Sequence, residues 1–569
     1  MTVNRTKLVM TCAVAMAATA LAAGSAAAQQ RTSDIHIQEL IKEAAQIAAS
    51  GQTSAPTTAQ QGGRTAAPQA GPRVALTLDD AVKLALERNL DIAVQRLNPE
   101  VSDLAVATAQ ATYLPNLTST LLTQGQTTAS TNSIAGGAAA SAITNDGTNW
   151  NGGLAQNLRK GGGSYSVSLN NTRTTSSSTV SLYNPSYTPL WTANYTQPLL
   201  RGFKTDASRQ QLQISKLNRD ISDVQLLSTI TNTLSNVRNA YWDYVFAVQS
   251  VEVAQQQLNL ANQQVQDNQT RVQVGTMAPI DVVQAQAQAA SALQNLVVAQ
   301  ATQRTSELAL KRLIVNGTQD PNWNASIDPV DRPDFRPETV DVEGAIRKAL
   351  SQRTDLLIAQ KTVQENDVTL KYLDDQTKPQ ADFLANYGLS GIGGTQLIRQ
   401  SSGVGVATNP VISTLPGGYG DSLASIFRND YPRWTAQVNI SYPLGLSTQK
   451  AAVARARVQL NQVQAQMKQI ELQVATDITN QAITIRSNVE RVQAAQSARE
   501  LAQRQLDAEN SKFAVGMSTN YFVISAQNQL ATAQNNELQA ILNYRKSLVD
   551  FDRLQQTTLQ SLNITVVGR

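Results

Sequence analysis

The sequence is poor in the side chains that carry most protein chemistry. Its 569 residues include one cysteine, Cys12, and one histidine, His36, while charged residues make up 15% of the chain and aromatic residues 5%. A single histidine excludes histidine metal clusters and most pairs of nucleophile and base. A glycine-rich phosphate loop and a cluster of metal ligands are also missing from the sequence. We therefore expect that the chain is not an enzyme and that it binds no metal and no cofactor.

Basic residues are too sparse for a nucleic-acid-binding protein. The formal net charge of +4 is spread over the whole chain, without clusters of lysine and arginine interleaved with aromatic residues. The low content of charged and aromatic residues, together with much Gln, Asn, Ser, Thr and Ala, argues against one large hydrophobic core. A long and thin protein that binds no nucleic acid fits this composition better.

Long apolar runs are missing except for one at the N-terminus. Arg5 and Lys7 precede sixteen mainly apolar residues, Leu8–Ala23, and small residues follow at 26–28. This pattern predicts a secretory signal peptide over residues 1–28. A retained membrane anchor is the alternative, but a helix needs about 20 residues to span a bilayer. Residues 29–73, rich in Ala, Gln, Thr, Gly and Pro, predict a flexible N-terminal leader of an exported protein.

The chain contains a tandem duplication. One set of residues recurs 264 positions later and a second set recurs 241 positions later. The first set is Ala81, Ala85, Leu86, Asp91 and Pro115, and the second is Gly275, Ala285, Gln286, Arg312 and Leu313. Because solenoid units have only about 20 to 50 residues, we interpret this as duplication of a whole architectural half. We predict a first repeat over 74–315, a proline-rich linker over 316–338 and a second repeat over 339–569.

A proline in each repeat is followed by segments with a period of two, which predicts amphipathic strands. We expect strands near 116–124 and 191–197 in the first repeat and near 381–389 and 434–442 in the second. The alternating segment 165–169 adds either a longer strand or a surface hairpin. The face that we expect to contact lipid carries Trp191, Tyr195, Phe383, Tyr387, Trp434, Val438, Ile440 and Tyr442.

The polar residues of the opposite face are mostly small and uncharged, which favours part of a membrane β-barrel over a soluble sandwich. Four strands per chain cannot close such a barrel, and open strand edges in lipid would leave backbone groups without partners. The chain must therefore oligomerise.

Two very long helices follow the strands, at about Lys204–Val274 and Gln449–Val515. Each would reach about 100 Å at a rise of 1.5 Å per residue. Turns at Gly275 and Gly516 predict antiparallel coiled-coil hairpins with return helices near 280–314 and 520–559. Shorter helices at 78–113, interrupted near Pro99, and at 342–373 could stack end to end on these return helices.

One position of each coiled-coil seam becomes polar towards the turn, and its amides can set the register of the contact. A helix that simply turns towards solvent is the alternative. The predicted seam amides are Gln255, Asn262, Gln269, Gln496, Gln503 and Asn510.

The order of short helix, strand pair, long helix, Val-Gly turn and return helix, given twice after a signal peptide, resembles the TolC-like outer membrane efflux protein family. The resemblance covers about 77–554 and depends most on Tyr113-Leu114-Pro115, on the segment 197–202 and on the two Val-Gly turns. It implies a homotrimer with one twelve-stranded barrel in the outer membrane lipid and a periplasmic tunnel, the α-barrel, built by the helices. It also implies two partners, a periplasmic adaptor (membrane fusion) protein and an inner-membrane transporter, which open the closed tip.

Several family members carry acidic residues near the second turn, but the matching segment 520–525 of this chain has none. We predict Gly275, Asp281, Gly516, Phe522 and Ser525 as residues of the periplasmic tip or gate, although Asp281 also fits an ordinary acid at a helix start. We expect a trimeric outer-membrane channel-tunnel that gives passive exit to solutes or proteins. The alternative is a periplasmic coiled-coil adaptor or a surface structural protein without a pore.

Overall fold

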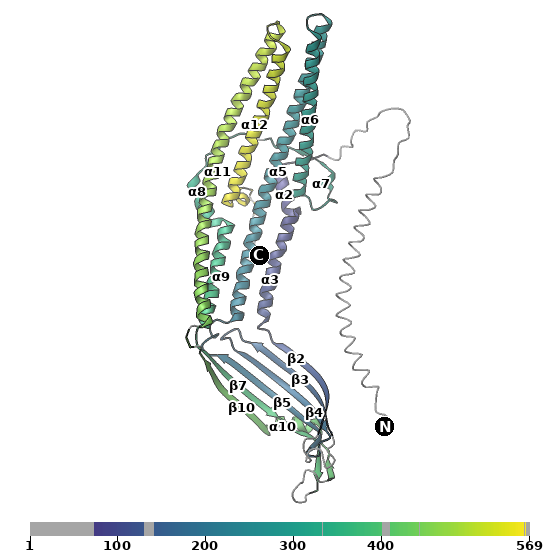
Figure 1. Cartoon of the computed structure of the whole chain (residues 1–569), viewed down its shortest axis with the longest axis vertical. Coiled ribbons are helices and arrows are strands. Elements are labelled where there is room, and N and C mark those ends of the chain that lie inside the picture. Colours follow the sequence, from purple (N-terminus) through teal and green to yellow (C-terminus); the bar gives the residue numbers. More distant parts are fainter. Residues whose placement is uncertain are drawn as a thin grey trace, which may run out of the picture. The chain divides into compact units, whose positions relative to one another are not determined.

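The computed structural model describes residues 73–129, 142–332, 334–400, 410–442, 444–445, 447–562 and 564. The predicted signal peptide and the leader up to residue 72, with Cys12 and His36, lie outside the described residues. The described part contains long helices and one large antiparallel sheet (Figure 1). Within it, no helix is both long enough and apolar enough to cross a membrane.

The two halves of the described chain contain the same succession of helices. The first half contains α2 (Leu78–Arg88), α3 (Leu90–Ala111), α5 (Ala207–Gln273) and α6 (Pro279–Ile314). The second half contains α8 (Val342–Gln352), α9 (Thr354–Gln376), α11 (Thr448–Ala514) and α12 (Asn520–Gln555). The helices α5 and α11 have 67 residues each, and α6 and α12 have 36 residues each. Equal lengths in the same order are what the predicted duplication requires.

The break in the first short helical segment lies at Asn89, so its predicted position near Pro99 was wrong. The Asn89 side chain accepts hydrogen bonds from the N–H groups of Asp91 (2.9 Å) and Ile92 (3.1 Å), and thereby caps α3. Its amide also donates to the carbonyl oxygen of Leu313 at 2.9 Å. Pro99 lies inside α3, where it removes one backbone donor without ending the helix.

Both helical hairpins turn at a glycine in the left-handed region of backbone conformation. Gly275 has φ +77° between α5 and α6, and Gly516 has φ +78° between α11 and α12. Glycine adopts this conformation without the steric cost of a Cβ atom. Pro279 lies in the first turn of α6, where its missing N–H is not needed. The predicted antiparallel hairpins are confirmed.

Six strands form the main path of the sheet, in the order β10-β7-β5-β4-β3-β2, and each pair is antiparallel. They are β2 (Asn116–Thr128), β3 (Ile143–Asn157), β4 (Ser164–Ser176), β5 (Tyr183–Pro198), β7 (Gln380–Ser390) and β10 (Tyr431–Ser441). Two shorter strands, β8 (Gly393–Arg399) and β9 (Val411–Leu415), extend the sheet beside β5, and α10 (Tyr419–Phe427) follows them.

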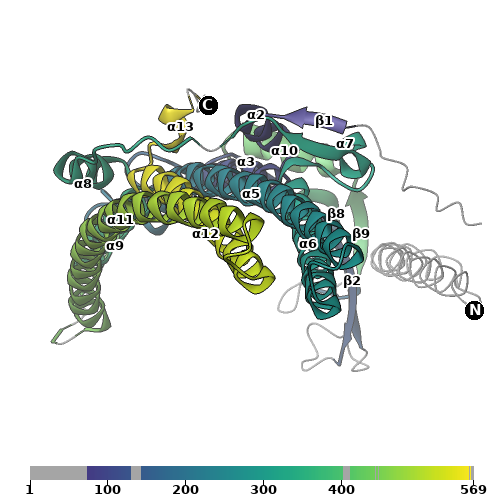
Figure 2. The same cartoon turned by 90° about the horizontal axis from the view of Figure 1, so that it is seen from above.

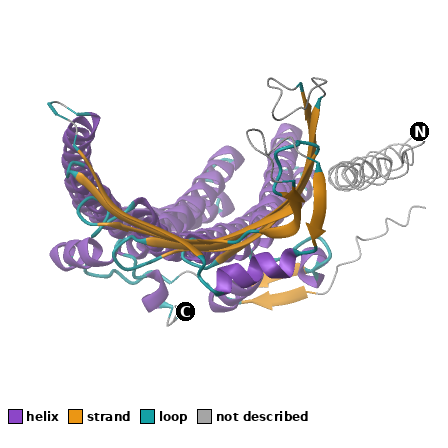
Figure 3. Cartoon of the chain, turned by 90° about the horizontal axis from the view of Figure 1, so that it is seen from below, coloured by secondary structure: helices purple, strands orange, loops and turns teal. Residues whose placement is uncertain are grey.

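The described sheet contains two more long strands than the four that we predicted for each chain. The alternating residues 165–169 belong to β4, which pairs with β3 as a hairpin between β2 and β5. The strand β3 was not recognised from the sequence because Asp146, Thr148 and Gly152 occupy positions on its apolar face, so that apolar and polar residues do not alternate. Seen from below, the sheet curves in the same sense as the helices behind it (Figure 3).

The linker between the repeats is tied to the first repeat by a small parallel sheet. It contains α7 (Pro321–Asn324) and β6 (Ser326–Pro329), and β6 pairs with β1 (Arg73–Leu76). These elements, α2 and the short C-terminal helix α13 (Thr558–Ser561) lie on the convex side of the arc formed by α5, α6, α11 and α12 (Figure 2).

The largest hydrophobic cluster lies where this small sheet meets α5. Leu234, Val237, Tyr241 and Tyr244 are all almost fully buried there. The Tyr241 hydroxyl lies 3.0 Å from the carbonyl oxygen of Leu76 and 2.8 Å from the Asp331 carboxylate. Burial raises the pKa of Tyr241 and of Tyr244 above the ordinary range, so both hydroxyls remain protonated donors.

The Tyr241→Phe substitution tests this junction, because it removes one buried hydroxyl and leaves its partners without that donor. We expect the free energy of unfolding to fall by about 1 to 3 kcal/mol, and the thermal unfolding midpoint to fall with it. Tyr521→Phe is the matched control, since Tyr521 is 66% exposed. Identical midpoints for the Tyr241→Phe variant and the unmodified protein would show that this hydrogen bond does not hold the linker.

Candidate functional site

The tips of the two helical hairpins lie at the end of the helices that is remote from the sheet (Figure 1). Near the tips, three buried amide side chains join α5 to α12. Gln264 and Asn268 on α5 each donate to the side-chain oxygen of Asn520 on α12 at 3.0 Å. The exposed fractions of the three side chains are 9%, 0% and 2%. We call Gln264, Asn268 and Asn520 the tip amide cluster.

The tip amide cluster also holds the start of α6. The amide nitrogens of Asn268 and Asn520 lie 3.4 Å and 3.3 Å from the backbone carbonyl oxygen of Asp281. Three helices from both repeats therefore meet at one set of hydrogen bonds. Because buried amides without partners are costly, this set fixes the register of the first hairpin against the second.

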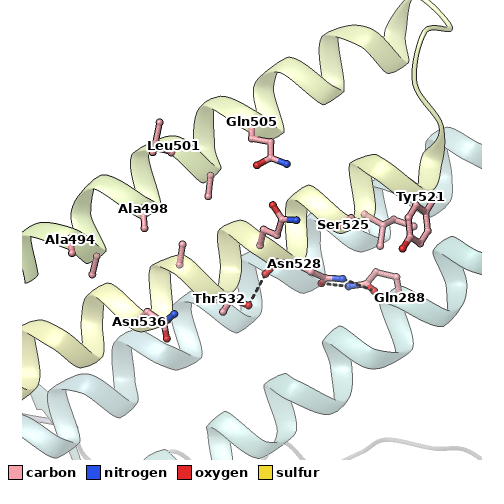
Figure 4. A pocket seen from close by; sticks show the side chains of 15 residues that line it. Gln288, Ala494, Ala498, Leu501, Gln505, Tyr521, Ser525, Asn528, Thr532 and Asn536 are labelled. Carbon is pink, nitrogen blue, oxygen red and sulfur yellow. Dashed lines mark hydrogen bonds between the residues drawn. The ribbon is translucent and has the colours of Figure 1, made fainter. Parts of the chain in front are cut away.

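A second set of amides lies about two helical turns deeper. Gln288 on α6 donates to the side-chain oxygen of Asn528 on α12 at 2.6 Å, and Gln257 on α5 donates to the same oxygen at 3.1 Å. Figure 4 shows Asn528 and Gln288 pointing towards each other at the edge of a groove. On α5, Gln257 and Gln264 are seven residues apart, which is the spacing of one coiled-coil position.

The groove beside Asn528 has a volume of about 990 Å³ and lies mainly between α11 and α12. Small side chains such as Ala494 and Ala498 line one wall, while Tyr521, Ser525 and Asn528 line the other (Figure 4). The groove thus offers an amide and aromatic surface next to the tip.

Charged side chains at the tips make contacts both between the two hairpins and within the second hairpin. The Arg271 guanidinium on α5 lies 4.4 Å from the centre of the Phe513 ring on α11, a cation–π contact between the two hairpins. At the second turn, hydrogen bonds from Lys512 and Ser518, each 2.7 Å long, hold the pKa of the Glu509 carboxyl below its ordinary value. The Glu509 contacts close the turn between α11 and α12.

The predicted gate residues lie close together at the tips. Gly275 and Gly516 form the turns, and the Asn520 bond to the Asp281 backbone puts the first turns of α6 and α12 side by side. Phe522 is 55% exposed and packs edge-on against Tyr521, with ring centres 5.7 Å apart. Ser525, one turn further along α12, faces the groove (Figure 4).

The predicted seam amides lie one position away from the seam that the structure contains. On α5, Ala254, Ala261 and Asn268 are buried, and each lies one residue before a predicted position. Gln255, Asn262, Gln269, Gln503 and Asn510 are exposed in the single chain, and Gln496 is half-buried. One residue corresponds to about 100° around a helix, so these amides point away from the contact within the chain.

The predicted apolar face of the sheet is one continuous surface. Paired positions share a face, and the register places Trp434 opposite Tyr387 and Val438 opposite Phe383. The same face includes Trp191, Tyr195 and Ile440, and Tyr442 follows directly after β10. Trp434 is 75% exposed and Ile440 is 74% exposed. On the opposite face Asn386 donates to Asn194, and Ser168 and Thr192 share a hydrogen bond of 2.9 Å.

The chain matches one known protein family. Residues 161–316 and 345–554, more than half of the chain, match the outer membrane efflux protein family. The chain belongs to the outer membrane efflux protein family. Its two matched segments fall in the two repeats. Membership in this family places the protein in the outer membrane as an efflux channel and not among enzymes.

Solved channels of similar fold are distant in sequence. OprN, described as an outer-membrane channel, is 14% identical, with a TM-score of 0.59 and coverage of 84% of this chain and 89% of that one. For the CmeC outer membrane channel of Campylobacter jejuni, the identity is 13%, the TM-score 0.59 and the coverage 89% and 94%. For the open MtrE outer membrane channel of Neisseria gonorrhoeae the values are 14%, 0.57, 84% and 88%. No curated protein sequence matches this chain.

The tip amide cluster of this efflux protein and the deeper set of Gln257, Gln288 and Asn528 were not predicted from the sequence. The seven-residue spacing of Ala254, Ala261 and Asn268 carries the signal, because it defines the seam that the structure contains. With so many alternating Ala and Gln residues, two neighbouring registers fit the helical pattern almost equally well. The partners on α12 become visible only when the two repeats are placed together.

The Asn520→Ala substitution would leave the donors of Gln264 and Asn268 without their acceptor. We expect the tip to open more easily by about 1 to 3 kcal/mol, which speeds backbone amide exchange there by about 5-fold to 150-fold. Hydrogen–deuterium exchange of peptides covering 264–281 and 516–530 measures the effect. Asn510→Ala, at an exposed position of α11, is the control. Equal exchange in the two variants would mean that the cluster does not hold the tip.

Proposed function

We propose that three copies of this chain form an outer-membrane channel-tunnel through which solutes or proteins leave the cell passively. The observation that carries this proposal is the pair of uncovered sheet edges. Every residue of β2 and every residue of β10, the two ends of the six-strand path, is exposed in the single chain. The same sheet has one apolar face and one polar face, as a barrel wall in lipid requires.

The strand directions allow the edges of neighbouring copies to join. Successive strands of the path are antiparallel, so β2 and β10 run in opposite directions. The edge β10 of one copy can therefore pair with β2 of the next in the antiparallel sense. Pairing satisfies the backbone groups that lipid cannot hydrogen-bond. The number three follows the family that the sequence resembles.

The helices extend the same ring into the periplasm. The chain passes from α3 into β2 and from β10 into α11 through short connections, so a closed ring of strands arranges the helices around the same axis. The lumen would be wet, because Ser, Thr and Asn side chains form the inner face of the sheet. A periplasmic adaptor protein and an inner-membrane transporter would deliver the cargo and supply the energy.

The hairpin tips form the constriction in this proposal. Three copies of Asp281 and three of Phe522 would lie at the same level around the axis, since the Asn520 contact aligns the two first turns within each copy. The carboxylates would favour cations, and the Phe522 rings would narrow the opening.

Substitutions at these two positions test the constriction. Phe522→Ala removes ring volume, so we expect a higher single-channel conductance in planar bilayers. Asp281→Ala removes a ring of carboxylates, so we expect a weaker preference for cations. Asn510→Ala serves as the control. Unchanged conductance and selectivity in both variants would place the constriction elsewhere.

The cellular location and assembly of the protein separate a channel from a periplasmic adaptor. We expect outer-membrane fractions to contain a trimer that persists in mild detergent and dissociates on heating. A periplasmic adaptor would lack the lipid-facing strands and would be recovered without the outer membrane. Recovery of this chain only as a soluble periplasmic species would overturn the proposed function.

A further inference from the structure

The hairpin β3–β4 lies inside the wall of the sheet. It pairs with β2 from Asn116 opposite Ala155 to Thr128 opposite Ile143. On its other side it pairs with β5 from Ser164 opposite Thr196 to Thr174 opposite Ser186. The strands β3 and β4 have 15 and 13 residues, and about 9 to 11 residues suffice for a tilted strand to cross a bilayer. The hairpin is therefore long enough and paired well enough to be a wall element.

At the end of the sheet nearer the helices, the two faces of the wall continue across the hairpin. One row of paired positions crosses all six strands on the apolar face, and the next row crosses them on the polar face. The apolar row is Leu117, Leu154, Val167, Ala193, Tyr387 and Trp434. The polar row is Asn116, Ala155, Ser166, Asn194, Asn386 and Thr435. Over residues 165–169 the hairpin shares the apolar outer and polar inner pattern of its neighbours, which a hairpin in water does not require. Asp146 and Arg173 lie on the same outer face, further from the helices.

A short helix fastens the hairpin to the rest of the wall. The Tyr419 hydroxyl at the start of α10 donates to the side-chain oxygen of Asn171 on β4 at 2.7 Å. Its ring lies edge-on to Trp150 on β3, with centres 5.4 Å apart, and 6.0 Å from the ring of Tyr187 on β5. One residue of the second repeat thus holds three strands of the first repeat together.

We infer that each copy contributes six strands to the barrel, so that the trimer closes with eighteen strands instead of twelve. This inference rests on the proposed function, because it requires the trimer to form. Barrel diameter grows roughly in proportion to strand number, so the bore would be about 1.5 times that of a twelve-stranded ring.

The wider barrel changes which part of the channel limits the size of the cargo. Barrels of 16 to 18 strands leave an open aqueous channel. The long helices of each copy are α5, α6, α11 and α12. Among the described residues, no additional long helix accompanies the additional hairpin β3–β4. In the proposed trimer the barrel is therefore wider than a twelve-stranded barrel would be, while the tunnel keeps the same set of helices. We therefore expect the helical tip, and not the ring of strands itself, to limit the size of the cargo.

Cysteine accessibility on β4 and β10 tests the inference in the assembled protein. In a Cys12→Ser background, Val167→Cys and Ser166→Cys sample the outer and inner faces of the hairpin. Val438→Cys and Asn439→Cys sample the same faces of β10. The protein in lipid vesicles is treated with a charged, membrane-impermeant maleimide, and bromine-labelled lipids quench a fluorophore attached at each position.

We expect the maleimide to label Ser166→Cys at least about tenfold faster than Val167→Cys, and Asn439→Cys at least about tenfold faster than Val438→Cys. The reason is that thiolates and charged reagents are excluded from hydrocarbon. We expect brominated lipid to quench only the fluorophores at 167 and 438. If Val167→Cys reacts as fast as Ser166→Cys while the β10 pair behaves as expected, the hairpin lies in water and the eighteen-stranded barrel is refuted. If the β10 pair also shows no contact with lipid, the proposed channel itself fails.

Discussion

The structure depends on the need to pair the backbone groups at the two open edges of one curved sheet. In water these backbone groups could form hydrogen bonds to solvent. The exposed apolar face that carries Trp434 and Ile440 is instead suited to hydrocarbon, which offers no hydrogen-bond donor or acceptor. A long, exposed edge is also a template for pairing with another chain. The edges β2 and β10 run in opposite directions, so copies of the same chain can satisfy each other.

The helices follow from the same constraint. Short connections join α3 to β2 and β10 to α11, so a closed ring of strands would set the circle on which the helices are arranged. Far from that ring, neutral amides hold the hairpin tips together. An exchange of such a hydrogen bond for bonds to water changes the free energy by only about 0.5 to 1.5 kcal/mol. The tip amide cluster can therefore fix a register and still be broken at a modest cost in free energy.

Much of the fold could be predicted from the sequence because its strongest signals are local. Gly275 and Gly516 mark turns that require left-handed backbone, and the clean alternation around Trp434 marks a strand with one apolar face. The strand β3 could not be recognised in this way, since polar residues and a glycine occupy positions on its apolar face. The tip amide cluster depends on contacts between repeats, and Asn520 has no local feature that distinguishes it from many other amides in the chain.

The closure of the sheet by neighbouring copies is tested most directly by a single-particle structure of the protein reconstituted in lipid nanodiscs. The account predicts a ring of three copies in which β10 of each copy pairs antiparallel with β2 of the next. A monomer in water that covers Trp434, Val438 and Ile440 with its own helices would contradict it.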